Sequence, residues 1–206
     1  MSEAAGVRMD VVAEAPLLGE WTPPWPVAAI APFEWIVLDG GASPETIGSV
    51  VALLAQYNRH RAPEGTADGS ATEVLRAIVA TESPILPGGV RVRDGAGNAV
   101  VPGCCCDVVT WREWLRVTDG ETSPWMGHDP WGWVEHTPSV VRVWSDEKAK
   151  PADVVVIPRA ELPRLLAGLR ADLEAFAARL HAWAMEIDPD LAGPLAERFR
   201  TAFVRV

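Results

Sequence analysis

Hydrophobic residues recur at helical spacing in the last quarter of the chain. Intervals of four and three residues alternate along Leu162, Leu166, Leu169, Leu173, Phe176, Leu180, Trp183 and Ile187. This spacing places them on one face of a long helix. A second apolar face follows Pro189 and contains Leu191, Leu195, Phe199 and Phe203. The pattern predicts a helical hairpin over residues 159–203 that turns at Asp188-Pro189.

Shorter helices are indicated by polar residues that cap helix starts. Ser43 precedes Pro44, while Ser70 and Thr110 each precede a Glu by three residues. Such side chains satisfy the free N–H groups of a first helical turn. We expect a helix after each cap, the third ending near Val117.

Apolar runs of strand length occupy residues 33–38, 90–93, 99–101, 131–135, 140–144 and 153–157. The second and third flank a Gly-rich turn and predict a hairpin. Strands followed by helices favour an α+β fold. We expect a small, mostly antiparallel sheet with helices on one side and a C-terminal helical hairpin.

Residues 1–28 are rich in Pro and Trp and predict an irregular arm, with residues 29–206 forming a single α+β domain. The run Trp21-Thr22-Pro23-Pro24-Trp25-Pro26 is typical of polyproline conformation. Its indoles either pack on the protein's own domain or bind a partner.

The charge balance excludes several classes of function. The 206 residues include 18 Lys or Arg and 28 Asp or Glu, a net charge of −10. Residues 1–150 hold 11 of the basic and 20 of the acidic groups, so nine of the ten net charges lie there. An acidic chain disfavours nucleic acid and anionic membrane as partners. No leader pattern or apolar span is visible, and we expect a cytoplasmic protein with reduced thiols.

One segment concentrates the unusual residues. Residues 103–147 contain all three Cys, six of the ten Trp and two of the four His. If the Cys run is extended, Cys104 and Cys106 point to one side and Cys105 to the other. With His128 or His136 they would form a metal site, for which zinc is the natural ion.

Two other interpretations of the Cys run remain open. A thiol just before a helix, with a His as base and Asp129 or Glu135 orienting it, would suit a reactive cysteine. Alternatively the run is structural, with buried thiols at a tight chain crossing and Trp111 and Trp114 packed beneath it.

The remaining candidate residues are aromatic and acidic. Trp131 and Trp133 alternate with Gly132, so a strand would place them on one face with Glu135. Exposed, such a group would form a binding surface; buried, it would be core. The candidate binding residues are Trp111, Trp114, Trp125, Trp131, Trp133, Asp129 and Glu135.

Three short motifs carry a family resemblance: Pro102-Gly103-Cys104-Cys105-Cys106, Trp111-Arg112-Glu113-Trp114 and Gly127-His128-Asp129-Pro130. They resemble small uncharacterised actinobacterial proteins with the motif PGCCCGLxxWRxW. This chain has Asp107 where that motif has Gly. The resemblance implies an immunity or interaction role and no assigned activity.

Nucleotide-binding and hydrolase motifs are absent from the sequence. We therefore expect a non-enzymatic, acidic binding protein of immunity or regulatory type, contacting a basic protein through its α/β face and Trp-rich segment. The alternatives are a metal- or thiol-dependent site at Cys104–Cys106 with His128 and His136, and a small-molecule enzyme with a Trp-lined pocket. The helix face over residues 162–187 could also form a homodimer.

Overall fold

The computed structural model describes residues 6–16, 19, 21–31, 33–61, 69–120, 122–146 and 153–206. The fold is α+β, with antiparallel sheets and a C-terminal pair of helices, as the sequence predicts. The chain divides into two compact units, Met1–Val12 with Gly88–Ala171 and Ala13–Pro87 with Asp172–Val206. The sequence analysis assigned residues 29–206 to one domain, whereas the contacts divide them between both units.

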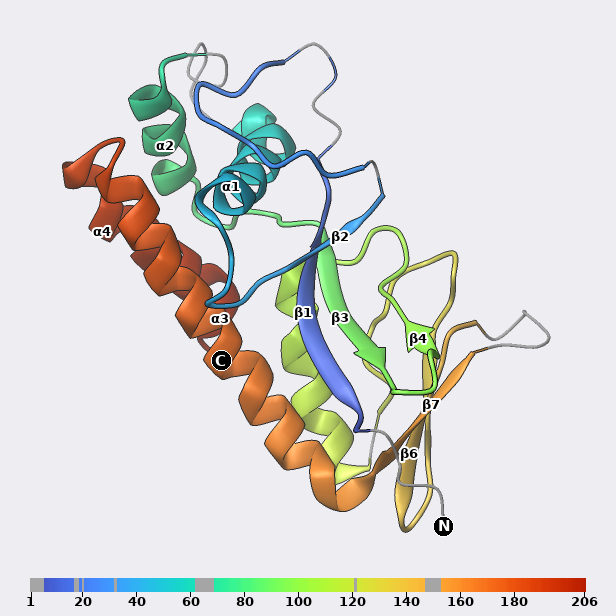
Figure 1. The fold of residues 1–206 in the computed structure, drawn as a ribbon. Helices are drawn as coiled ribbons and strands as arrows, with labels where there is room; N and C mark the ends of the chain where they lie inside the picture. Colours follow the sequence, from blue (N-terminus) through green and yellow to red (C-terminus); the bar gives the residue numbers. More distant parts are fainter. Residues whose placement is uncertain are drawn as a thin grey trace. The chain divides into compact units, whose positions relative to one another are not determined.

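Two sheets form the first unit, where the sequence predicted one. Strands β1 (Arg8–Glu14), β3 (Gly88–Arg93) and β4 (Ala99–Val100) lie side by side in that order (Figure 1). The second sheet is the antiparallel meander β5 (Trp133–His136), β6 (Val140–Trp144) and β7 (Val154–Pro158). The predicted β3–β4 hairpin is confirmed, with Val92 opposite Val100.

Strand β1 corrects the prediction of an irregular arm over residues 1–28. Met9, Val11 and Val12 are buried in it, and Asp10 accepts hydrogen bonds from Arg91 and Arg93 of β3. The run Arg8–Glu14 interrupts its apolar residues with Arg8, Asp10 and Glu14. Its strand conformation therefore depends on pairing with a distant segment, which the local pattern does not reveal.

The 3₁₀-helix η2 (Val108–Asp119) follows the Cys run and contacts β3. Its N-cap is Asp107, whose carboxylate accepts the Val109 N–H at 2.9 Å. The predicted cap at Thr110 is wrong, because the Thr110 hydroxyl instead donates to the Asp107 carbonyl at 2.7 Å. Gly120 ends the helix with a φ of 79°, as expected of a C-cap glycine.

The second unit contains most of the helical residues. Its elements are β2 (Trp35–Val37), α1 (Pro44–Asn58), η1 (Arg59–Arg61), α2 (Ala71–Ala80), α4 (Pro189–Phe199) and the π-helical turn η4 (Arg200–Val204). The caps at Ser43 and Ser70 are confirmed, the latter as a complete capping box with Glu73. Helix α2 contacts both α1 and α4.

The Trp25 indole packs within this second unit rather than projecting from it. Its Nε1–H donates to the Gly48 carbonyl at 2.9 Å, and its ring meets the edge of Trp183 at 5.5 Å. Gly48 permits this approach, because a Cβ there would collide with the Pro26 carbonyl. The Pro/Trp run is therefore anchored to α1, which supports packing on the protein's own domain.

The short turn η3 (Arg159–Glu161) leads into the long helix α3 (Leu162–Met185). Buried side chains form most of its predicted stripe: Leu162, Leu166, Leu169, Leu173, Phe176, Leu180 and Trp183. Ile187, predicted as the last member, lies beyond the end of the helix and is half-buried. The stripe belongs to the core of a single chain, so it is not the exposed face that the dimer hypothesis requires. No described helix is long and apolar enough to cross a membrane.

Candidate metal centre

Two segments of the first unit cross closely: residues 103–104, which precede η2, and residues 126–128, which follow it. Gly103 N–H donates to the Met126 carbonyl at 2.6 Å, and His128 N–H donates to the Cys104 carbonyl at 2.9 Å. Cys104 and His128 form an antiparallel bridge. Opposite residues in such a pair direct their side chains to the same face, with Cβ atoms roughly 5 Å apart. The crossing therefore brings a thiol and an imidazole together from positions 24 residues apart in the sequence.

Two glycines allow this close approach. A Cβ at Gly103 would collide with the His128 carbonyl oxygen, and one at Gly127 would lie 2.5 Å from the Gly103 oxygen. Gly127 also has a φ of 92°, which disfavours any other residue. A tight crossing at the Cys run is thus present, but it is made with residues 126–128 rather than between the hairpin and the helix, and glycines beside the cysteines make it possible.

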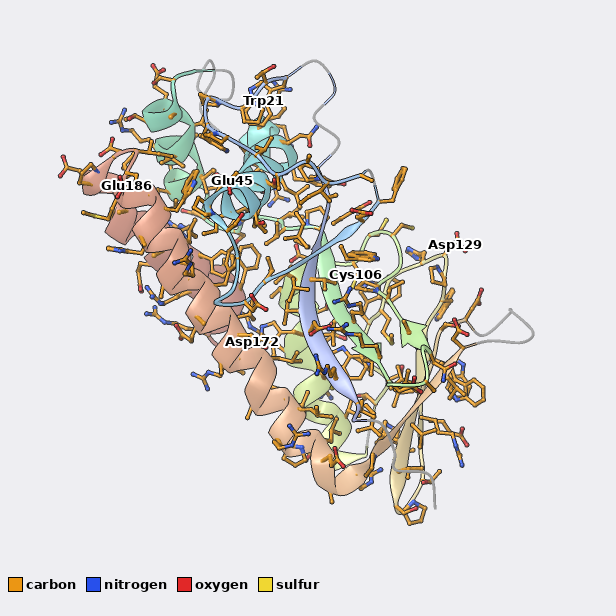
Figure 2. The ribbon with its side chains drawn as sticks, viewed as in Figure 1. Trp21, Glu45, Cys106, Asp129, Asp172 and Glu186 are labelled. Carbon is orange, nitrogen blue, oxygen red and sulfur yellow. The ribbon has the colours of Figure 1, made fainter. Side chains whose placement is uncertain are left out.

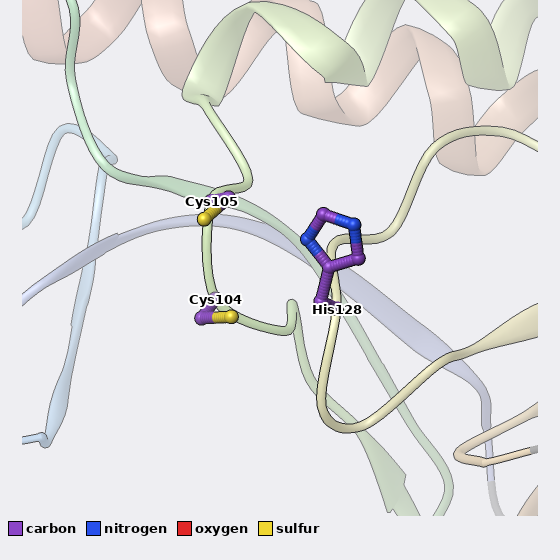
Figure 3. Close-up of side chains that lie close together, drawn as sticks. All are labelled: Cys104, Cys105 and His128. Atoms are coloured by element: carbon purple, nitrogen blue, oxygen red, sulfur yellow. The ribbon is translucent and has the colours of Figure 1, made fainter.

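The Cys105 sulfur is the third potential ligand, and the backbone conformation of Cys105 brings it near the other two. Its φ is 61°, in the left-handed region that non-glycine residues rarely adopt. An extended run would direct Cys105 away from Cys104, but this turn breaks the alternation. The sulfurs of Cys104 and Cys105 and a ring nitrogen of His128 all lie within 4.8 Å of one another (Figure 3). All three residues are exposed, so an ion can reach them from solvent.

Cys106, the ligand that strand alternation favours, lies apart from this group. It is buried, whereas Asp129 on the crossing loop is exposed, and both side chains are labelled in Figure 2. Its sulfur contacts Thr110 Oγ1 at 3.3 Å and the Trp125 carbonyl at 3.8 Å, and it lies close to Gly89 of β3. Cys106 is therefore part of the packing between β3 and η2, as the structural interpretation proposed for the whole run.

His136 is also placed elsewhere by the structure. It lies on β5, with Nε2 3.2 Å from the Thr122 carbonyl and Nδ1 3.3 Å from the Arg159 guanidinium. Both ring nitrogens thus have partners within the protein. The metal set proposed from the sequence, Cys104, Cys106, His128 and His136, is reduced to Cys104 and His128, with Cys105 in place of Cys106.

The electrostatics of Cys104 and Cys106 do not suit an activated nucleophile. Desolvation raises the pKa of the Cys104 thiol, and the neighbouring Cys105 and Asp129 raise it further. Burial raises the pKa of the Cys106 thiol as well. Catalytic cysteines depend on a lowered pKa that maintains the thiolate. The Asp129 carboxylate that opposes the thiolate would favour a bound cation at the same place.

The tryptophans of this segment fall into three groups. Trp111 and Trp114 lie on one face of η2 and are buried, with exposed fractions of 0 and 1 %. Trp125 and Trp131 meet each other and His128 edge to face. The first pair is core, whereas both tryptophans of the second group contact His128, one of the metal ligands.

Trp133 belongs to the third group. It stacks on Trp144 across β5 and β6, with centroids 5.8 Å apart. The Glu135 carboxylate accepts hydrogen bonds from Trp144 Nε1 at 3.3 Å and from Arg142 at 3.2 Å, so it stabilises this hairpin. Trp131 precedes β5, and strand alternation therefore does not relate it to Trp133 as the sequence suggested.

The sequence did not indicate that Cys105 is a potential metal ligand. It also did not indicate that Glu113 borders a pocket beside Trp125. A positive φ at Cys105 has no local signal, since Gly or Asn usually marks such positions.

The chain matches no protein-family model, no curated protein and no solved structure, so its own geometry carries the functional argument.

Proposed function

We infer that the protein binds a zinc ion through Cys104, Cys105 and His128. The observation that carries this proposal is the convergence of two sulfurs and one imidazole nitrogen within 4.8 Å. Ligand atoms around one tetrahedral zinc lie about 3.6–3.8 Å apart, given the usual Zn–S and Zn–N lengths. The exposed side chains need only small rotations to reach that separation.

The donor set selects the class of ion. Thiolate and imidazole suit zinc, whereas magnesium and calcium prefer oxygen ligands. Two thiolates neutralise the charge of a divalent cation, and Asp129 adds negative potential nearby. Three protein ligands leave one coordination position for water or a further ligand, as in zinc sites that are not purely structural.

The rigid part of the site is the backbone crossing. Cys104 and His128 are held by the bridge hydrogen bond, and the His128 ring packs edge to face against Trp125 and Trp131. These contacts are made within the protein and hold two of the three ligands close together, which limits the ordering required on binding. Such preorganisation favours affinity by lowering the entropic cost of assembling the ligands.

Titration of chelator-treated protein with zinc, in competition with a chromophoric chelator, tests the proposal. We expect one zinc per chain in the wild type and loss of binding in Cys104→Ser and His128→Ala. His136→Asn is the matched control, because His136 shares the segment but lies outside the cluster, and it should bind as the wild type does. Absence of wild-type binding, or equal loss in His136→Asn, would overturn the assignment.

A further inference from the structure

A pocket of about 270 Å³ opens in the first unit next to the proposed metal ligands. Three indoles border it, those of Trp125, Trp131 and Trp133, together with Pro124, Met126 and Glu113. Its volume lies just below the roughly 300–1,000 Å³ usual for drug-sized ligands. The space therefore suits a small ligand or one end of a larger one.

The indoles form walls rather than a closed core. Trp125 and Trp131 meet at 73° with centroids 6.4 Å apart, so they do not stack on each other. Trp133 is held by its stacking on Trp144. Trp131 is 45 % exposed and Trp125 and Trp133 are half-buried, and accessible aromatic surface gathered at one concave place is characteristic of binding sites.

The charge of the pocket favours a cation. Among its described lining residues, Glu113 is the only one with a charged side chain. Its Oε2 accepts a hydrogen bond from the backbone N–H of Trp125 at 2.7 Å, and this bond holds the carboxylate at the pocket wall. Indole faces attract cations through the ring quadrupole, and a carboxylate adds a Coulombic contribution.

The hydrogen-bonding capacity of the pocket narrows the kind of cation. A primary ammonium carries three N–H donors and a guanidinium five, and each donor taken from water on binding must find another acceptor. The described lining side chains offer oxygen acceptors only at Glu113 and Ser123, and Ser123 Oγ already accepts the Val134 N–H at 3.0 Å. A quaternary ammonium has no N–H to satisfy and presents methyl groups to the indoles.

We propose that this pocket binds a quaternary ammonium group, with the indoles of Trp125, Trp131 and Trp133 around the methyl groups and Glu113 as counter-ion. This inference rests on the pocket alone and does not require a bound metal. The group could come from a choline-like small molecule or from a trimethylated lysine, which present the same chemistry.

Calorimetric titration of metal-free protein with choline and with its neutral isostere, in which carbon replaces the quaternary nitrogen, tests the charge requirement. We expect choline to bind at least about tenfold more tightly, as desolvated cation–π contacts predict. Equal binding of the two compounds, or binding of neither, would overturn the proposal.

Two variants connect the ligand to the pocket. Trp131→Leu keeps an apolar side chain but removes a ring face, and we expect choline to bind about tenfold more weakly. Glu113→Gln removes the counter-ion and tests the pocket independently should Trp131→Leu fold poorly. Trp21→Leu, outside the pocket, is the matched control and should bind as the wild type does. Equal losses in Trp21→Leu would contradict the assignment.

A third probe, the amide of N-acetyl-trimethyllysine, distinguishes the two sources of the group. Tighter binding than choline would support a modified protein side chain, and weaker binding would support a free small molecule. Because the metal-free protein is used, failure of choline binding leaves the zinc proposal intact, and failure of zinc binding leaves this one intact.

Discussion

Cys104 and His128 face each other across an antiparallel bridge, with the His128 N–H 2.9 Å from the Cys104 carbonyl. This relationship sets the geometry of the candidate metal centre. The bridge aligns a thiol and an imidazole on one face, and the left-handed turn at Cys105 adds the second sulfur. The proposed zinc site thus depends on backbone conformation more than on the identity of neighbouring side chains.

Gly127→Ala should strongly destabilise the first unit. The added Cβ would lie 2.5 Å from the Gly103 oxygen, and the backbone there has a φ of 92°. Because backbone atoms cannot give way cheaply, we expect the free energy of unfolding to fall by at least about 3 kcal/mol. Chemical denaturation would measure the change.

Gly97→Ala is the matched control for that substitution. Gly97 also has a positive φ, 97°, but a Cβ there meets nothing within 4 Å. Only the conformational penalty remains, about 1–2 kcal/mol. If both variants lost equal stability, the close crossing would not be the reason for glycine at position 127.

Substitution of a buried tryptophan and of an exposed one should have different effects on the free energy of unfolding. Trp111→Ala removes a completely buried indole and should lower the free energy of unfolding by about 3–5 kcal/mol. Trp131→Ala removes a ring that is 45 % exposed, and we expect a loss of about 1 kcal/mol or less. Thermal or urea denaturation would decide. A larger loss for Trp131 would place that ring in the core instead.

Local patterns were sufficient for much of the fold. The α3 stripe, the Ser43 and Ser70 caps and the β3–β4 hairpin each depend on residues close in sequence, and all are present. Strand β1 could not be predicted in this way, because its partners lie far along the chain. The choice between Asp107 and Thr110 as N-cap was also not resolved, since both residue types cap helices.

The candidate site was predictable in location but not in its ligands. The density of Cys, Trp and His pointed to residues 103–147, and Cys104 and His128 were among the candidates. Regular strand alternation then selected Cys106 over Cys105. The positive φ of Cys105 reverses that choice, and it stands directly beside the crossing with the Gly127-His128 segment, which is a tertiary feature.

Protein stability should fall as the pH rises above 9, in part because of Cys106. Burial raises the pKa of this thiol above its ordinary value of 9.0. Between that value and the higher folded-state pKa, the folded protein retains a proton that the unfolded chain has lost. The free energy of unfolding therefore falls as the pH rises through this interval. Below the interval, the contribution of Cys106 to stability does not change with pH.

Cys106→Ala isolates this contribution. Its free energy of unfolding, measured by urea denaturation between about pH 8 and pH 10, should decline less steeply than that of the wild type. Cys104, whose pKa is also raised, remains in both proteins and adds a slope of the same sign. Identical slopes in the two proteins would show that Cys106 titrates normally in the folded state.

Contact with a basic protein partner through the acidic α/β face stays a prediction, as does the resemblance to actinobacterial proteins of immunity or interaction type. The zinc and quaternary ammonium proposals are compatible with it. Asp129 and Trp131 lie on the exposed side of the same crossing and could contact a partner. The Trp111 and Trp114 indoles could not, because η2 holds them in the core.

The most direct test of the account compares zinc binding by Cys105→Ser and Cys106→Ser. The geometry assigns Cys105 to the ion and Cys106 to the packing between β3 and η2. In a competition titration, Cys105→Ser should weaken zinc affinity by more than about 100-fold, whereas Cys106→Ser should retain one zinc per chain. The reverse result, with binding lost in Cys106→Ser and kept in Cys105→Ser, would contradict the proposed centre.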